Sequence, residues 1–293
     1  MMAHSPGDTA FLPSLPQLLI DDAVRAALRE DLGRAGDITT NATIAEDAKA
    51  TAILSSREMG TVCGTGFARA AFALIDPALK FEALVRDGEK VSPGEKLARV
   101  TGNARAILSA ERVALNYMMH LSGIATYTAR FVDLVNETKA RVCDTRKTIP
   151  GMRAFAKYAV KCGGGANHRF GLDDAILIKD NHIAVAGGVT NAIEAARAYA
   201  GHLVKIEIEV DGLAQFEEAL AAKADVILLD NMGPELLEKA VGINAGRAIL
   251  EASGGIGFDT IKAVAQTGVD YISTSKITMA APTLDIGLDI EIA

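Results

Sequence analysis

Short β-branched runs alternate with amphipathic stretches of about a dozen residues through the second half of the chain, and this alternation constrains the fold more than any other feature. Strands that alternate with helices in this way build a parallel sheet with helices packed on it. No Gly-x-Gly-x-x-Gly follows the first run, so a dinucleotide-binding sheet has no support. The pattern favours a closed or nearly closed α/β barrel. The six predicted strands cover residues 141–145, 175–179, 204–210, 225–229, 247–251 and 271–274, and the helices between them are predicted to begin near Pro150, Val189, Gly212, Pro234 and Phe258.

The first half of the chain has a different character. Residues 18–32 carry apolar side chains at helical spacing and are followed by Gly33, which predicts a surface helix with one buried stripe. Residues 50–103 consist of short apolar runs between turn signals such as Asp87-Gly88, and they predict a mostly antiparallel β region. Residues 105–137 predict long helices that break near Ser122-Gly123.

The composition excludes several classes of partner. The 30 Lys and Arg residues are outnumbered by 37 Asp and Glu residues, so no strongly basic surface is expected for nucleic acid or an anionic membrane. No apolar run approaches the ~20 residues that a membrane span needs, and the start of the chain lacks the pattern of a secretory signal. The cysteines Cys63, Cys143 and Cys162 form no Cys-x-x-Cys pair, as suits a reducing compartment. We expect a cytoplasmic protein that acts on small molecules, with neither nucleic acid nor membrane as a partner.

Charged or hydroxyl residues follow nearly every predicted strand. In α/β barrels the active site lies at the carboxyl ends of the strands, and charges that recur there on consecutive strands indicate such a site. The residues at these ends are Arg146 with Lys147, Lys179, Glu209, Asp230, Ser253, and Ser273 to Ser275.

Period-2 alternation places some of these charges on one face of their strand. Lys205, Glu207 and Glu209 alternate with two isoleucines that suit the helix-facing side, so the three charges are predicted to point into the barrel. The alternative is an edge strand with a solvated face. Buried charges must be paired, because an isolated one costs several kcal/mol. We therefore predict a layer of charges with counter-ions beneath it, formed by Arg146, Lys179, Glu209 and Asp230 above Asp144 and Glu207.

A local concentration of cations in an acidic chain predicts a small substrate that carries several negative charges. His168 and Arg169 lie in a Gly-rich loop that leads into the second predicted strand, and Arg146, Lys147 and Lys179 join them at the strand ends. Arg binds carboxylates in a planar bidentate manner, and Lys supplies point charges for phosphate. Two further cations, Lys157 and Lys161, stand four residues apart on a predicted helix and are expected to form a solvated face.

Two acids and a glycine-rich segment at 253–257 add predicted contacts for a metal, a ribose or a phosphate. Glu209 and Asp230 suit either a divalent metal such as Mg²⁺, held together with substrate phosphates, or the hydroxyls of a ribose. The segment SGGIG at 253–257 follows a strand and precedes a helix, so its backbone amides form a phosphate cradle. The simpler interpretation is that its glycines serve a tight turn.

Several long segments resemble the decarboxylating quinolinate phosphoribosyltransferase family. They are REDLGRAGDITT, AERVALNYMMHLSGIAT, CDTRKTIPGMR, KYAVKCGGGANHRFGLDDAILIKDNHI, IEIEVD, VILLDN and EASGGI, and together they span most of the chain. The resemblance implies an incomplete TIM-like α/β barrel over residues 126–279. It also implies an N-terminal α/β sandwich domain over 1–125, joined by the C-terminal tail 280–293. The implied activity is transfer of phosphoribose from phosphoribosyl pyrophosphate to quinolinate, with Mg²⁺ and no organic cofactor.

The resemblance also implies roles for individual residues at the quinolinate end. Family members form homodimers with shared active sites, and Arg112 resembles the arginine that one subunit donates to the other. Arg146, His168 and Arg169 resemble the quinolinate ligands within the subunit.

At the phosphoribosyl pyrophosphate end, the implied residues are the lysines of the pyrophosphate, the acids of the ribose and metal, and the 5′-phosphate loop. They are Lys147 and Lys179, then Glu209 and Asp230, then Ser253, Gly254 and Gly255. One position departs from the family pattern, because Ser275 stands where the family usually has Gly.

Three other functions remain open at this point. A phosphoribosyltransferase acting on nicotinate is countered by the surplus of cations, which suits a second carboxylate. A Schiff-base barrel aldolase would use Lys179 as its reactive amine. A non-catalytic phosphoribosyl-binding regulator is countered by the intact acids Glu209 and Asp230. His120 and His182 are expected to serve packing.

Overall fold

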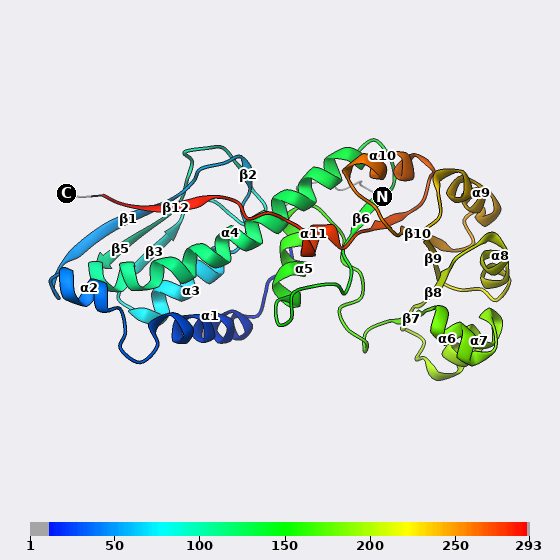
Figure 1. Cartoon of the computed structure of the whole chain (residues 1–293), viewed down its shortest axis with the longest axis horizontal. Helices are drawn as coiled ribbons and strands as arrows, with labels where there is room; N and C mark the ends of the chain where they lie inside the picture. Colours follow the sequence, from blue (N-terminus) through cyan, green and yellow to red (C-terminus); the bar gives the residue numbers. More distant parts are fainter. Residues whose placement is uncertain (1–11, 292–293) are drawn as a thin grey trace. The chain divides into compact units, whose positions relative to one another are not determined.

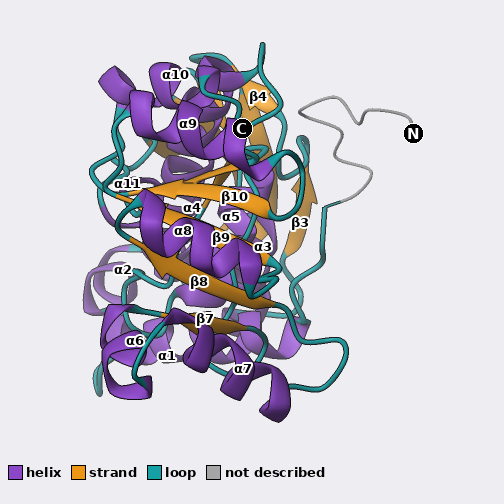
Figure 2. Ribbon diagram, turned by 90° about the vertical axis from the view of Figure 1, so that its right-hand side faces the viewer, coloured by secondary structure: helices purple, strands orange, loops and turns teal. Residues whose placement is uncertain are grey.

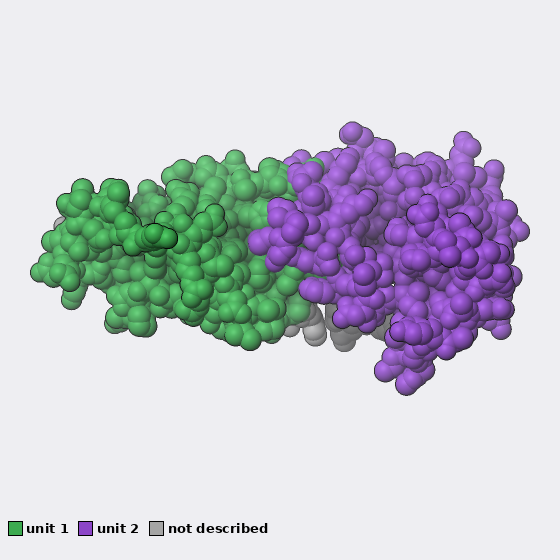
Figure 3. All heavy atoms as spheres, turned by 60° about the horizontal axis from the view of Figure 1, so that its bottom comes forward, with its two compact units in different colours: residues 1–129, 154–164, 281–293 green, residues 130–153, 165–280 purple. Residues whose placement is uncertain are grey.

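The computed structural model describes residues 12–291, which divide into two compact units. Unit 1 contains the chain up to Ala129, the segment Ala154–Gly164, and the chain from Ala281 onward. Unit 2 contains Arg130–Arg153 and Gly165–Ala280 (Figure 3). A short helical segment that lies between two barrel strands in sequence thus groups with unit 1.

Unit 1 is built on a four-stranded antiparallel sheet with the strand order β12-β1-β5-β3. The central strand β1 (Lys49–Ser56) pairs with β5 (Lys96–Asn103) and with β12 (Ile286–Glu291), and β5 pairs with β3 (Lys80–Ala83). The C-terminal strand is therefore an integral part of this sheet. A smaller ribbon joins β2 (Gly60–Thr61) to β4 (Lys90–Val91).

Helices pack against this sheet and supply much of the unit's core (Figure 1). Phe67 and Phe72 of α3 are fully buried, as is Ile107 of α4, because each helix turns one apolar stripe inward. The helices are α1 (Gln17–Leu32), α2 (Ile38–Thr43), α3 (Thr65–Ile75), α4 (Ala104–Val135), whose last residues belong to unit 2, and α5 (Arg153–Cys162), of which all but the first residue belongs to unit 1.

The predicted break near Ser122-Gly123 is wrong, because α4 runs through these residues without interruption. A Cβ at Gly123 would overlap the backbone of Pro282 in the C-terminal tail. Ser122 is fully buried and bonds the backbone of Cys63. Both small residues therefore allow close packing, and neither ends the helix.

Unit 2 contains a six-stranded parallel sheet with helices on its outer face, as Figure 2 shows for β7 to β10. The strand order is β6-β11-β10-β9-β8-β7, with β6 and β7 at its two ends, so the barrel is incomplete. The expected α/β barrel class is confirmed. The strands are β6 (Arg141–Cys143), β7 (Ile176–Ile178), β8 (Ile206–Val210), β9 (Val226–Asp230), β10 (Ile249–Ser253) and β11 (Tyr271–Ser273).

The helices of unit 2 begin close to the predicted positions. Pro234 is the first residue of α9 and Phe258 the first of α10, each after a glycine. Two short helices were not predicted, α6 after β7 and α11 after β11. The helices are α6 (Asp180–Ala186), α7 (Val189–Tyr199), α8 (Leu213–Ala221), α9 (Pro234–Asn244), α10 (Phe258–Gln266) and α11 (Lys276–Met279). Across residues 12–291, no helix combines the length and apolarity needed to cross a membrane.

Candidate active site

The parallel register brings the predicted strand-end residues to one edge of the sheet in unit 2. Asp230 of β9 lies opposite Ser253 of β10, and Glu209 of β8 lies opposite Leu228 of β9. Lys179 follows β7 directly, and Arg146 and Lys147 follow β6. Because neighbouring parallel strands end at the same edge, five segments far apart in sequence contribute to one site.

Two lysines and two acids form the first group at this edge. The Nζ of Lys179 donates to Oε2 of Glu209, and the glutamate side chain is mostly buried. Burial raises the pKa of Asp230, and the negative charges of Glu209 and Asp211 raise it further, whereas the charges of Lys179 and Lys147 lower it. The site therefore holds close like charges that a cationic or hydroxyl-bearing ligand would stabilise.

A second group surrounds His168 inside the barrel. Its Nε2 lies 2.9 Å from Oε2 of Glu207 and 3.7 Å from Oε1 of Glu251, and its Nδ1 accepts a hydrogen bond of 2.7 Å from the backbone nitrogen of Arg169. Burial raises the pKa of Glu251 to about 7, the charge of Glu207 adds to this, and His168 opposes it. The imidazole is thus held between a backbone amide and two buried carboxylates.

Asp144 and Arg153 fix the loops that carry the cations. Asp144 is fully buried and accepts hydrogen bonds of 2.7 Å from Nδ2 of Asn167 and 2.8 Å from the backbone nitrogen of His168. Arg153 donates to Oγ1 of Thr148 and to the carbonyl oxygens of Phe170 and Arg146. The loop after β6 and the Gly-rich loop before β7 are therefore connected to each other.

Arg146 and Arg169 form a cationic pair beside this network. Burial lowers the pKa of Arg169, and the positive charge of Arg146 lowers it further, whereas the charge of Glu207 opposes the change. The Nη1 of Arg169 donates to the carbonyl of Ala175 at 3.1 Å, while its buried Nε has no hydrogen-bond partner within residues 12–291. An anion placed here would satisfy that donor and reduce the repulsion between the two guanidinium groups.

The loop after β10 turns through two glycines in the left-handed backbone region. Gly254 and Gly255 have φ values of 97° and 62°, which L side chains rarely adopt, and a Cβ at Gly254 would overlap the side chain of Asn231. Nδ2 of Asn231 donates to Oδ2 of Asp230 at 2.7 Å, so this loop and the acidic group are packed together. Ser253 ends β10 at the entrance of this loop.

The last strand-end loop lies next to the first. The backbone nitrogen of Thr274 donates to the carbonyl of Cys143 at 3.1 Å, and Thr278 donates to the carbonyl of Lys147 at 2.8 Å. Ser275 stands between them as the residue before α11, with a φ of −76° that any residue adopts. The backbone there does not require glycine.

Two of the predicted placements are wrong. Lys205 precedes β8 with an exposed side chain, and it pairs with Asp225 at 2.7 Å at the amino-terminal edge of the sheet, so it does not point into the barrel. Lys157 is only 4 % exposed, and it does not form a solvated face with Lys161. Periodicity extended the strand face to Lys205, one residue before β8 begins, and it did not show that the side chain of Lys157 is covered by packing.

The remaining predicted residues are placed as follows. Arg112 lies exposed on α4 in unit 1, whereas the strand-end residues belong to unit 2. His182 accepts a hydrogen bond of 2.9 Å from the backbone nitrogen of Lys179 at the start of α6, a packing role. Sequence reasoning missed Arg153, Asn231 and Glu251. The signal for Glu251 was present, because it stands two residues before Ser253 and so shares a strand face with it.

Comparisons with known proteins show which sequences and folds this chain is similar to. The model of the quinolinate phosphoribosyl transferase N-terminal domain matches residues 37–122, and that of the C-terminal domain matches residues 124–289. The nicotinate-nucleotide pyrophosphorylase (carboxylating) of Mycobacterium leprae is 43% identical over 92% of this chain and 96% of its own length. The decarboxylating quinolinate phosphoribosyltransferase 1b of Nicotiana tabacum is 40% identical over 95% of this chain and 84% of its own length.

A solved structure extends the similarity to three dimensions. The nicotinate-nucleotide pyrophosphorylase of Francisella tularensis superposes with a TM-score of 0.92 at 41% identity, covering 96% of this chain and 99% of that one. Sequence and fold therefore agree along nearly the whole length.

Proposed function

The chain belongs to the quinolinate phosphoribosyltransferase family, and we propose that the strand-end residues of unit 2 perform the family's reaction. In that reaction quinolinate and phosphoribosyl pyrophosphate give nicotinate mononucleotide, CO₂ and pyrophosphate, a step of NAD biosynthesis. The observation that carries the assignment of residues is the convergence of cations and acids from separate strands on one edge of the sheet.

Arg146 and Arg169 bind the two carboxylates of quinolinate in this proposal. Their mutual repulsion and the unpartnered Nε of Arg169 support it, because a dicarboxylate would satisfy both. His168 would join them by exchanging its contact with Glu207 for one with a substrate carboxylate. Holding the carboxylates fixes the ring nitrogen in position for attack on C1 of the ribose.

Lys147 and Lys179 bind the pyrophosphate, and the loop of Ser253, Gly254 and Gly255 binds the 5′-phosphate, with Ser275 beside it. Both lysines act on Asp230 electrostatically, so the leaving group and the ribose acids would be adjacent. As the C1–oxygen bond breaks, negative charge grows on pyrophosphate and the lysines stabilise it.

Glu209 and Asp230 are the residues that would hold Mg²⁺. Their carboxylates are hard oxygen donors whose close charges raise the pKa of Asp230, which is the donor set that a divalent cation with bound phosphates prefers. When bound, Mg²⁺ supplies neutralisation of the pyrophosphate charge. The same acids orient the ribose hydroxyls.

Decarboxylation follows attack without a covalent enzyme intermediate. Once the pyridine nitrogen bonds to C1, the ring carries a positive charge. The bond from the ring to the 2-carboxylate breaks, CO₂ leaves, and the electron pair remains on the ring carbon, where the cationic nitrogen stabilises it until a proton is added.

The site is completed by a second copy of the chain in a homodimer, with Arg112 as the donated group. The support is the exposure of Arg112 in unit 1 and the need for positive charge around a dicarboxylate. We place the reaction in the cytoplasm, because the three cysteines form no disulfide within residues 12–291, which suits a reducing compartment.

Incubation of the purified chain with quinolinate labelled with ¹³C in its 2-carboxylate, phosphoribosyl pyrophosphate and Mg²⁺ tests this function. We expect unlabelled nicotinate mononucleotide and labelled CO₂ in equal amounts. Turnover of nicotinate at an equal or higher rate would establish the nicotinate enzyme instead. Borohydride trapping of a carbonyl substrate on Lys179 would establish the aldolase, which the engagement of Lys179 with Glu209 disfavours.

A further inference from the structure

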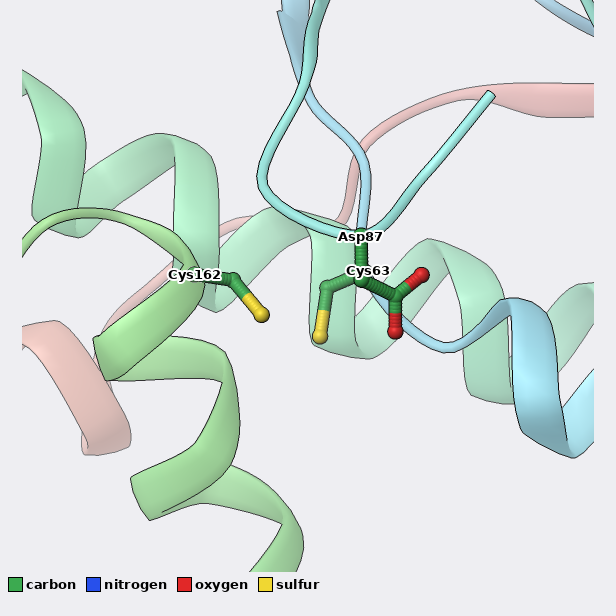
Figure 4. A group of neighbouring side chains, drawn as sticks. All are labelled: Cys63, Asp87 and Cys162. Atoms are coloured by element: carbon green, nitrogen blue, oxygen red, sulfur yellow. The ribbon is translucent and has the colours of Figure 1, made fainter. Parts of the chain in front are cut away.

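Two buried cysteines and an aspartate meet in unit 1, in a group that the reaction does not use. Cys63 precedes α3, Asp87 lies between β3 and β4, and Cys162 ends α5 (Figure 4). One ligand atom from each residue lies within 4.8 Å of the other two. Cys63 is fully buried and Cys162 is 6 % exposed. The group therefore combines two soft sulfur ligands and one carboxylate in the protein interior.

The backbone at both cysteines is held in place by α4. Two hydrogen bonds to Ser122 fix the backbone of Cys63. Its nitrogen donates to Oγ of Ser122 at 2.9 Å, and its carbonyl oxygen accepts from the same hydroxyl at 3.0 Å. Cys162 is followed by Gly163, where a Cβ would overlap the carbonyl of Ala125 in α4. The two sulfurs are thus presented from positions that packing defines.

Asp87 is oriented by four hydrogen bonds to its side chain. It accepts from the backbone nitrogens of Gly64 at 3.0 Å and Thr65 at 3.1 Å, from Oγ1 of Thr65 at 2.8 Å, and from the hydroxyl of Tyr158 at 3.0 Å. Such partners fix a ligating carboxylate in metal sites and tune its basicity. Asp87 and Tyr158 also line a cavity of about 510 Å³, so the carboxylate side of the group adjoins open space.

Burial raises the pKa of the Cys63 thiol well above its usual value, and the Cys162 thiol and the charge of Asp87 raise it further. A protonated, buried thiol is a poor nucleophile and resists oxidation. A thiophilic cation changes this balance, because it deprotonates the thiols that bind it.

We propose that Cys63, Cys162 and Asp87 form a binding site for a thiophilic divalent cation of the Zn²⁺ type. Binding forms one bond from the cation to each sulfur and one to Oδ2 of Asp87, where the cation replaces the hydrogen bond from the hydroxyl of Tyr158. Both thiol protons pass to solvent, and the Tyr158 hydroxyl turns toward the cavity that it lines. Binding would draw the three ligand atoms together to tetrahedral spacing, with one further ligand completing the shell. This site is separate from Glu209 and Asp230, which lie in unit 2 and offer only oxygen ligands.

Titration of the reduced full-length protein with Co²⁺ tests the proposal, because thiolate ligands give a near-ultraviolet charge-transfer band that oxygen ligands do not. We expect the band in the unchanged protein and in Cys143→Ser, which removes the buried cysteine of β6 outside the group. We expect its loss in Cys63→Ser and in Cys162→Ser. Absence of the band from the unchanged protein, or its persistence in both of these variants, would overturn the site.

A second measurement needs no variant and so does not depend on how well the variants fold. X-ray absorption of the unchanged protein loaded with one equivalent of Zn²⁺ should show two sulfur neighbours at about 2.3 Å with lighter ligands completing the shell. A shell of oxygen and nitrogen alone would place the ion elsewhere and contradict the proposal. Neither experiment involves turnover, so its result is independent of the phosphoribosyl transfer.

Discussion

At the scale of single residues, the ion pair of Lys179 with Glu209 joins a lysine that we propose binds pyrophosphate to an acid that we propose binds the ribose. Lys147→Ala and Lys179→Ala should each raise the barrier by roughly 3–4 kcal/mol, a loss of about 10²–10³ in kcat, because each removes a group that stabilises developing charge. Steady-state kinetics with circular dichroism as a folding control measures this. Near-normal kcat in both variants would remove these lysines from the site.

A substitution at Ser275 tests whether its hydroxyl binds the phosphate of phosphoribosyl pyrophosphate, where the family usually has a glycine. Its φ of −76° suits any residue, so Ser275→Gly removes the hydroxyl without relieving backbone strain. We expect KM for phosphoribosyl pyrophosphate to stay the same or fall slightly. A tenfold rise in KM, about 1.4 kcal/mol, would instead identify the hydroxyl as a phosphate ligand.

Glu251 makes the stability of the fold depend on pH, in a direction that follows from its pKa. Its pKa is about 7 in the fold, against an ordinary value of 4.5, because burial and Glu207 disfavour the charged form. Its contribution to stability is therefore complete below about pH 4.5 and is lost as the pH rises through about 7. The other ionisable groups facing it are His168 and Asp144.

Thermal unfolding of Glu251→Gln across this pH range measures the effect. The midpoint of the unchanged protein should fall relative to that of the variant as the pH rises, since glutamine has no proton to lose. Glu238→Gln, on the exposed face of α9, is the matched control and should follow the unchanged protein. Parallel curves for all three proteins would contradict the assignment.

At the scale of elements, two helical glycines have opposite surroundings. A Cβ at Gly123 of α4 meets the backbone of Pro282, which cannot rotate away, whereas a Cβ at Gly242 of α9 meets nothing within 4 Å. We expect Gly123→Ala to lower the free energy of unfolding by roughly 1–3 kcal/mol through overpacking. Gly242→Ala should raise it by about 0.5–1 kcal/mol, because alanine favours the helix. Denaturant unfolding measures the free energy of unfolding of both variants. Equal changes in the two would refute the packing role of Gly123.

The same elements show what local pattern can predict. The six barrel strands and the starts of α7, α9 and α10 were predictable because hydrophobic periodicity and Gly or Pro boundaries are local signals. The continuity of α4 was not, because it depends on a tail that is distant in sequence.

The strand-end residues were predictable in the same way, since their place follows from the strands. The burial of Lys157 depends on how its helix packs, and the partnership of Glu251 with His168 depends on two strands whose spacing no local signal specifies. Long-range contacts thus account for what the sequence left open.

At the scale of the whole molecule, the proposed site takes its parts from two copies of the chain. Unit 2 supplies the strand-end residues, and the proposal assigns Arg112 of unit 1 to the site of the partner subunit. Arg112→Ala and Arg146→Ala should each leave a homodimer nearly inactive, because each removes one carboxylate ligand from every site.

Mixing these two inactive variants under subunit exchange tests this central claim most directly. In a mixed dimer both lesions fall on one site and leave the other intact, so activity should return to about a quarter of the unchanged protein if exchange is random and the sites are independent. One variant is labelled with ¹⁵N, so that native mass spectrometry separates mixed dimers from both homodimers and establishes that exchange has occurred. If mixed dimers form and no activity returns, Arg112 does not act across the interface, and the shared-site account is wrong.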